Sequence, residues 1–545
     1  MGNTISYTTS PIDLPLGPRG TIRGLQFDTK ARRYAGIPYA LPPTGQHRWR
    51  KPRPLPSSYT YTGNTSNSAF DATKFKPVCP QKPYHVGGSA EGGDDAYSED
   101  CLFVNIWTPV PDPRDQEKEK KWPVMLWLHG GWFQMGDPSQ EAGLDPTELI
   151  STGKLNAIVV AIGYRLNVFG FLAGPDVLAE SERDENGQSG GNFGLWDQRL
   201  AAEWVYENIE LFGGDRENIT LAGRSAGAYS VEAQMLYEFR HGSSPESPRL
   251  YKRFFMDSNA IPAQPKSLSD TKEQFDELCA YFNIEPQASS EEKLSQLRQK
   301  TPPELVAAIP NLKNHTFRPV TDGLFIHQRM AEYLASKEFA SAFKARKARL
   351  LIGEVLNEET LYSTYNSPSE PTMEALRTQI GNYYAPDVTE RALKCYTMPE
   401  SKDLDEWKKL FGQIISDGQV RAPSRALVSN LISNGVDLAN AWRYQIAYRL
   451  SFIDEKVAPM SFGVAHAMDK PFWNFSICYG PTPSERKLME DWIKNLVAFV
   501  NDDTSFEFGT KSVQEMKVVS PEGVIEIKSD ERWEELLRIG QIFAQ

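Results

Sequence analysis

Residues 219–234 constrain the fold of this chain more than any other stretch. They read ITLAGRSAGAYSVEAQ, in which four residues with strand propensity run directly into a glycine-flanked serine and then into a helix-compatible run. A strand, a tight turn and a helix in direct succession place the side chain of Ser225 at the apex of the turn, clear of the sheet. Gly223 and Gly227 occupy positions where a side chain would collide with the crowded backbone. Ser225 is therefore a candidate nucleophile, although a serine that only caps the following helix satisfies the pattern G-x-S-x-G equally well.

Alternating strand and helix patterns on both sides of this stretch predict the α/β class. The runs at 122–128 and 157–162 are almost continuously apolar, which is typical of strands covered on both faces. The patterns predict strands at 102–108, 122–128, 157–162, 349–352 and 439–448, helices at 195–212 and 485–499, and mainly helical insertions at 264–345 and 372–435. We therefore expect a central, mostly parallel sheet flanked by helices, with the large helical insertions lying over a site.

Length and charge narrow the class of protein further. The chain has 545 residues and no repeat, long linker or low-complexity tract, so we expect residues 1–545 to form a single domain, with 1–15 as a poorly ordered tail. The formal net charge of -12 argues against a nucleic-acid partner, because a phosphate-binding face needs clustered Lys and Arg. No apolar run approaches the roughly 18 residues of a membrane span, so we expect no transmembrane segment.

The N-terminus lacks the basic and apolar regions of a secretory signal, which predicts an intracellular, cytoplasmic location. Residues 1–6, MGNTIS, match the myristoylation pattern with Gly2 as acceptor, so peripheral membrane contact is an alternative. No basic patch follows to supply a second anchoring signal. The five cysteines are an odd number, and the unpaired thiol that this leaves suits a reducing compartment.

A serine hydroxyl attacks an ester only when a base takes its proton and a third group orients that base. His466, in a loop after the last core strands, is the candidate base, because the other histidines occupy polar, helical or glycine-turn contexts. The loop after the strand at 349–352 offers three candidate acids: Glu354, Glu358 and Glu359. The order serine, acid, histidine is the one expected of an α/β-hydrolase arrangement.

A glycine turn directly after the strand at 122–128 supplies the remaining requirement of acyl transfer. Its sequence is His129-Gly130-Gly131, and glycines there allow backbone N–H groups to point at an oxyanion. The N–H of Ala226, immediately after the candidate nucleophile, would complete such a hole.

From about residue 15 to its C-terminus the chain resembles the type B carboxylesterases, the family that includes cholinesterases and fungal lipases. The matching segments are YAGIPYALPPTG, SEDCLFVNIW, WLHGG, GYRLNVFGFL, NFGLWDQRLAAEWVYENIELFGGDRENITLAGRSAG, GEVLNEETLY and VAHAMDKPFW. The resemblance implies an α/β-hydrolase fold and hydrolysis of a carboxylic ester through an acyl-enzyme. It assigns Ser225 as nucleophile, Glu358 as acid and His466 as base.

The same resemblance implies further roles. Gly131, Trp132 and Ala226 fall at the oxyanion-hole positions, and Ser258 matches a serine that supports the acid from behind. Cys79 and Cys101 match the first disulfide of the family. No metal or organic cofactor is implied, and the expected partner is a small-molecule ester.

The chain departs from the family pattern at three positions near the site. Trp132 stands where the family has a glycine or alanine, and we expect its indole to restrict the acyl or alcohol pocket. Arg224 replaces a glutamate before the nucleophile, and it either favours an anionic substrate or pairs with Glu354 or Glu359. Glu359 replaces a glycine next to the assigned acid, so it remains the alternative to Glu358.

Two other functions fit the same sequence. One is a catalytically inactive hydrolase fold used as an interaction protein, against which the complete set of serine, glutamate and histidine argues. The other is a hydrolase that acts on an amide, a lactone or a thioester.

Overall fold

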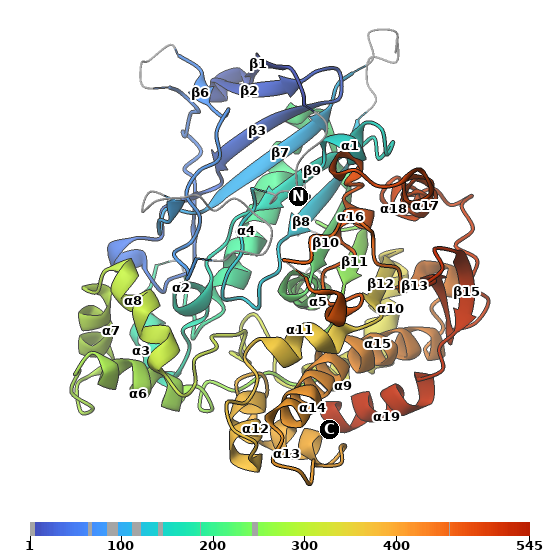
Figure 1. Cartoon of the computed structure of the whole chain (residues 1–545). Helices are drawn as coiled ribbons and strands as arrows, with labels where there is room; N and C mark the ends of the chain where they lie inside the picture. The colour runs from blue at the N-terminus through green and yellow to red at the C-terminus, as the bar shows by residue number, and fades with distance from the viewer. Residues whose placement is uncertain are drawn as a thin grey trace.

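The computed structural model describes residues 6–63, 68–83, 96–111, 121–139, 145–185, 187–241, 249–456 and 458–545. A large mixed sheet crosses the molecule from the blue strands β1 and β2 to the red strand β15 (Figure 1). In spatial order its strands are β1 (Thr9–Pro15), β2 (Thr21–Phe27), β3 (Ala31–Pro38), β7 (Phe103–Pro109), β9 (Ile158–Ile162), β8 (Trp122–Leu128), β10 (Gly214–Arg224), β11 (Arg253–Asp257), β12 (Arg349–Val355), β13 (Ala441–Ile446), β14 (Glu515–Val519) and β15 (Ile525–Ser529). The short β6 (Phe70–Asp71) pairs with β2, and β4 (Ala40–Leu41) pairs with β5 (Arg53–Pro54).

The central part of the sheet is parallel and its margins are antiparallel. Every pairing from β9 through β14 is parallel, whereas β1, β2, β3 and β7 join one another and β9 in antiparallel fashion, as β15 joins β14. Because the central strands all run in the same direction, their carboxyl ends lie at one edge of the sheet. Open α/β sheets carry their sites at this edge. The predicted α/β class is confirmed.

Both faces of the sheet are covered, as the apolar strands predict. In β8, Val124, Leu126 and Leu128 face one core cluster, while Met125 and Trp127 face another. The first cluster is completed by α2 (Asn167–Phe171), α4 (Phe193–Asn208), α5 (Ala226–His241), α10 (Lys337–Ala345) and α15 (Ala422–Ser433). The second is completed by α1 (Thr147–Ile150), α16 (Lys470–Trp473), α17 (Pro483–Trp492) and α18 (Lys494–Val500).

Two groups of helices outside these layers contain most of the insertions expected at 264–345 and 372–435, although α10 and α15 of those ranges pack on the sheet. The groups also include helices from outside those ranges, at 175–180, 358–364 and 533–544. The first contains α3 (Pro175–Glu180), α6 (Lys272–Tyr281), α7 (Ser290–Arg298) and α8 (Pro302–Ala308), and α9 (Met330–Leu334) precedes α10. The second contains α11 (Glu358–Thr364), α12 (Met373–Gly381), α13 (Pro386–Leu393), α14 (Leu404–Ser416) and the C-terminal α19 (Trp533–Ala544). The second group encloses a third apolar core and gathers beneath the sheet in Figure 1.

Two predictions about elements are wrong. Thr9–Pro15 is a strand paired with β2 along its whole length, so the tail expected over 1–15 is ordered at these positions. Its Ile12 and Leu14 pack on the first core cluster, and Asp13 forms an ion pair with Arg23 at 2.6 Å, contacts that the local sequence does not reveal. The single helix expected at 485–499 is divided into α17 and α18.

Gly2, the acceptor in the N-terminal myristoylation pattern, lies outside the described residues, so the prediction about it stays a prediction. Within the described parts of the chain, the helices are too short or too polar to cross a membrane.

Candidate active site

Ser225 occupies the single residue between β10 and α5, as the sequence predicts. Its φ of 56° is left-handed, a conformation that costs a non-glycine residue about 1–3 kcal/mol and occurs mainly at functional sites. The flanking glycines are required by close approaches: a Cβ on Gly223 would lie 2.5 Å from the Gly227 carbonyl, and a Cβ on Gly227 would lie 2.1 Å from Leu128 O. The turn is therefore a strained elbow rather than an ordinary helix cap.

Neighbouring strands hold the elbow in place. Arg224 pairs with Asp257 at the end of β11, and the Ser225 N–H donates to Asp257 O at 2.7 Å. The residue that follows Asp257 is Ser258, so the register of two parallel strands brings Ser225 and Ser258 to the same edge of the sheet. Ser225 itself is 7% exposed, so a substrate reaches it through an enclosed site.

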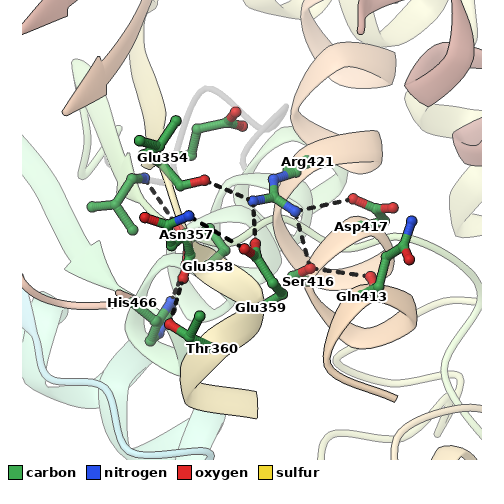
Figure 2. Close-up of polar contacts among 12 residues, drawn as sticks. Glu354, Asn357, Glu358, Glu359, Thr360, Gln413, Ser416, Asp417, Arg421 and His466 are labelled. Carbon is green, nitrogen blue, oxygen red and sulfur yellow. Dashed lines mark hydrogen bonds and ion pairs between the residues drawn. The ribbon is translucent and has the colours of Figure 1, made fainter. Parts of the chain in front are cut away.

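The structure brings three of the predicted residues together in one hydrogen-bonded chain. The Ser258 hydroxyl donates to Glu358 Oε1 at 2.7 Å, and the Val355 N–H donates to the same oxygen at 2.9 Å. The other oxygen, Glu358 Oε2, lies 2.5 Å from His466 Nδ1 (Figure 2). Both carboxylate oxygens are thus occupied by donors, which leaves one orientation for the imidazole.

His466 is 6% exposed and the ring of Tyr362 lies 5.2 Å from it, centroid to centroid. Its other nitrogen, Nε2, has no hydrogen-bond partner among the described residues although it is buried. A carboxylate on Nδ1 favours the tautomer that leaves Nε2 free to accept a proton. The histidine is therefore arranged to act as a base.

A backbone connection aligns the loops that carry Glu358 and His466. Asn357 forms a bridge with Ala465, the Asn357 N–H donates to Val464 O at 2.9 Å, and the Val464 N–H donates to Asn357 Oδ1 at 3.0 Å. Gly463 has a φ of 62°, and a Cβ there would lie within 2.3 Å of Asn357 Oδ1. We did not predict a role for Asn357, because its partners lie more than 100 residues away in the chain.

The other two candidate acids point elsewhere. Glu359 Oε2 accepts a bond from Arg421 Nη2 at 2.6 Å, on the side of the helix away from His466 (Figure 2). Glu354 is bound by both terminal nitrogens of Arg425, at 2.6 and 2.9 Å. Of the three, Glu358 is the one bonded to the histidine.

The glycine turn approaches the elbow from the end of β8. A Cβ on Gly130 would lie 3.0 Å from Ser225 Cβ, and Gly131, Trp132 and Phe133 have consecutive left-handed φ angles of 112°, 57° and 66°. Within the described parts of the chain, the N–H groups of Gly131, Trp132 and Ala226 donate to no other residue. Free amides beside a nucleophile are the donors that an oxyanion requires.

A family model with the description Carboxylesterase family matches residues 10–540. The chain belongs to the carboxylesterase family. An esterase/lipase of Schizosaccharomyces pombe is 37% identical over 98% of this chain and 97% of its own length. A carboxylic ester hydrolase of Gibberella moniliformis is 36% identical, again over 98% and 97%, and the acetylcholinesterase of Bungarus fasciatus is 28% identical over 87% and 76%.

The solved structure of a thermophilic PNB esterase superposes with a TM-score of 0.73 at 24% identity, over 97% of this chain and 99% of that one. At this identity the likeness shows the fold. The α/β-hydrolase fold predicted from the resemblance is confirmed, and the family is one of carboxylic ester hydrolases.

Arg224 does not pair as expected. Glu354 and Glu359, its predicted partners, are taken by Arg425 and Arg421, and Arg224 forms no ion pair with another described residue. Its guanidinium lies 5.9 Å from the ring of Trp127, on the second core face of the sheet. The prediction failed because alternation along β10 turns Arg224 away from the loop that carries the glutamates.

Two buried carboxyls, Asp257 and Asp469, lie close enough to Arg224 for its positive charge to lower the pKa of each. Asp257 accepts a bond from the Tyr444 hydroxyl at 2.8 Å, and Asp469 accepts one from Trp473 Nε1 at 3.1 Å. Burial raises the pKa of both, and the pKa of Asp257 is raised further by Asp469. Their remaining oxygens have no other donor among the described residues, so a proton shared between the two carboxyls satisfies both.

The indole of Trp132 packs against the third core cluster, and its ring centroid lies 6.0 Å from that of Tyr365. It therefore links the glycine turn to the helical insertion, and its effect on the pocket stays a prediction. Cys79 and Cys101 are buried neighbours within hydrogen-bonding distance, but their thiols are not joined by a disulfide in this structure.

Proposed function

We propose that the chain hydrolyses a carboxylic ester with Ser225 as nucleophile, His466 as general base and Glu358 as the group that orients the base. The observation that carries the proposal is the contact of Glu358 with His466 Nδ1 at 2.5 Å, with Nε2 of the same buried ring unpartnered. The elbow geometry of Ser225 and the three free amides support the same assignment.

The reaction proceeds in two halves. Ser225 Oγ attacks the ester carbonyl carbon while its proton passes to His466 Nε2, and the N–H groups of Gly131, Trp132 and Ala226 bind the tetrahedral oxyanion. The tetrahedral intermediate collapses, the C–O bond to the alcohol breaks, and the alcohol leaves with the proton from His466.

Water then adds to the acyl-enzyme carbonyl as His466 takes one of its protons. Collapse of the second intermediate releases the carboxylic acid and returns the proton to Ser225 Oγ. Each oxyanion donor is expected to contribute about a hundred- to a thousandfold to the rate. Glu358 stabilises the imidazolium that forms in each half.

The test uses p-nitrophenyl esters of graded chain length with the full chain and with Ser225→Ala. We expect turnover by the full chain and a loss of about a thousandfold or more in kcat for the variant, with unchanged thermal unfolding. Stoichiometric labelling of Ser225 by an organophosphonate is the second readout.

The inactive, interaction-only alternative requires that Ser225 is not labelled and that no ester is turned over. Labelling at Ser225 without turnover of any open-chain oxygen ester would instead direct the search to amides, lactones and thioesters.

A further inference from the structure

A small cavity lies beside the first turn of α5, the helix that begins directly after Ser225. Its lining residues are 262–266, 316, 318–320 and 382–384, together with Thr271, Gln274, Gln419 and Tyr229 of α5. The Tyr229 N–H donates to Ser225 O at 3.0 Å, so this wall of the cavity is the first turn of the helix that begins at the nucleophile. The cavity volume of about 30 Å³ is enough for about two water-sized groups, which is the size of a carboxylate.

Two cations line this cavity, Arg318 and Lys266, and its lining among the described residues contains no Asp or Glu. Neither cation forms an ion pair with another residue in the described parts of the chain. Burial, with the positive charge of Arg318 as the next contribution, lowers the pKa of Lys266 to about 8. Asp270, Glu273 and Glu277 act on Lys266 from a distance in the opposite direction and do not compensate.

Arg318 has partial compensation from its surroundings. Its Nη2 donates to Gln419 Oε1 at 2.8 Å, and its guanidinium carbon lies 5.0 Å from the ring of Tyr383 and 5.9 Å from that of Tyr229. These contacts alone could stabilise an arginine with a purely structural role, since an aromatic face stabilises a guanidinium. They leave most of its five N–H donors available.

Lys266 has no such compensation. No hydrogen bond, ion pair or ring contact of its ammonium exists with the described residues, although the side chain is partly buried. A buried ammonium without a partner is costly, and an anion bound in the cavity would offset this cost for both cations at once.

Two contacts link the segment that carries Arg318 to the residues just after the proposed oxyanion amides. The ring of Phe133, the residue after Trp132, lies 5.7 Å from the Arg318 guanidinium. Gln134 ties the two segments together, because its Nε2 donates to Phe317 O at 2.5 Å and its Oε1 accepts from the Phe317 N–H at 3.2 Å. Arg318 is therefore held close to the segment that follows the proposed oxyanion amides.

We propose that Arg318 and Lys266 form a binding site for a carboxylate of the substrate, so that the preferred esters carry a free carboxylate in addition to the ester bond. The proposal rests on the proposed function. It replaces Arg224, which lies on the other core face, as the cation that selects an anionic substrate.

The test compares kcat/KM for anionic and neutral esters of matched length. For the acyl side, the monoethyl esters of glutaric, adipic and pimelic acids are compared with ethyl esters of straight-chain acids of the same length. For the alcohol side, 4-carboxyphenyl butyrate is compared with 4-(methoxycarbonyl)phenyl butyrate. We expect the full chain to prefer the anionic ester about tenfold or more in one series, as charge-assisted hydrogen bonds of this kind provide.

Arg318→Gln and Lys266→Met should each lower this preference about tenfold, with kcat/KM for the neutral ester unchanged within about twofold. Arg318→Lys should keep part of it, because the charge remains while the planar fork is lost. Arg486→Gln, which removes an exposed cation on α17, is the matched control and should leave the preference intact. The preference of the full chain should also decline as the pH rises through about 8, where free Lys266 loses its proton.

Three results would overturn the proposal. The first is an absent preference in both series, and the second is an equal loss on both kinds of ester in Arg318→Gln and Lys266→Met, which indicates a structural role. The third is that added acetate or phosphate changes the rate on neutral esters in the full chain but not in Arg318→Gln, while anionic esters are not preferred. That result indicates that the cavity binds a free anion and not a carboxylate of the substrate. Turnover of neutral esters in all these cases keeps the proposed function intact, whereas its failure removes turnover and Ser225 labelling together.

Discussion

The two adjacent glutamates of α11 provide the sharpest test of the proposed catalytic residues. Glu358 is fully buried and bonded to His466, while the side chain of Glu359 is 31% exposed and paired with Arg421. Replacing each by glutamine removes one negative charge and leaves the volume almost unchanged. The two variants therefore separate the effect of the position from the effect of the substitution.

The hydrogen bonds around Glu358 predict how a glutamine would sit there. The Val355 N–H can only donate, at 2.9 Å, so the amide oxygen must take the place of Oε1. The amide NH2 group then faces His466 Nδ1, which must accept, and the ring proton moves to Nε2. In that tautomer the imidazole cannot take the proton of Ser225.

A wrong tautomer of this kind costs about three to four orders of magnitude in kcat, which corresponds to about 4–5.5 kcal/mol of transition-state stabilisation. Glu359→Gln loses a partly exposed ion pair, which is worth at most about 1 kcal/mol, and we expect its kcat to stay within about threefold of the full chain. The assay is kcat on p-nitrophenyl butyrate, normalised to folded protein by thermal unfolding. The assignment is refuted if Glu359→Gln falls as far as Glu358→Gln, or if Glu358→Gln keeps more than about a tenth of the activity.

Three further predictions concern the pocket, a buried acid and the core of the insertion. Trp132→Gly should raise the rate on bulky esters relative to small ones, and an unchanged ratio would contradict a restrictive indole. Burial raises the pKa of Glu232 to about 8, so the folded state keeps a proton that the unfolded chain releases above its ordinary value of 4.5. The stability that this group contributes is present below about pH 4.5 and is lost as the pH rises towards 8. Glu232→Gln removes this loss, so the unfolding free energy of the variant minus that of the unchanged chain should grow from pH 5 to pH 7, by about 3 kcal/mol at most. A difference that is independent of pH would exclude this cause. Arg425→Met leaves Glu354 and Asp530 buried with fewer partners and should lower the unfolding free energy by about 3–5 kcal/mol in denaturant titrations, whereas a neutral effect would mean that the pair is readily replaced by apolar contacts.

The local sequence already contains the information for the elbow. Ser225 sits between β10 and α5 because strand propensity, two glycines and helix propensity follow one another within a few residues, and no distant contact is needed to read them. The same holds for β8 and the glycine turn after it. The apolar runs also predicted the parallel centre of the sheet, because only strands covered on both faces can be apolar throughout.

The tertiary structure decided which partners the three glutamates contact. Glu354, Glu358 and Glu359 differ little in sequence context, and their roles separate only because Arg425, His466 and Arg421 arrive from other parts of the chain. Arg224 pairs with neither glutamate, because alternation along β10 points its side chain to the other face of the sheet.

Lys266 and Arg318 belong to no motif, and the sequence does not reveal that they face one cavity without a carboxylate. The sequence by itself therefore determined the fold class and the family resemblance and predicted the nucleophile, since each depends on short-range patterns. The identity of the glutamate that contacts His466, and the cavity that two cations line, depend on long-range contacts, so only the folded structure revealed them.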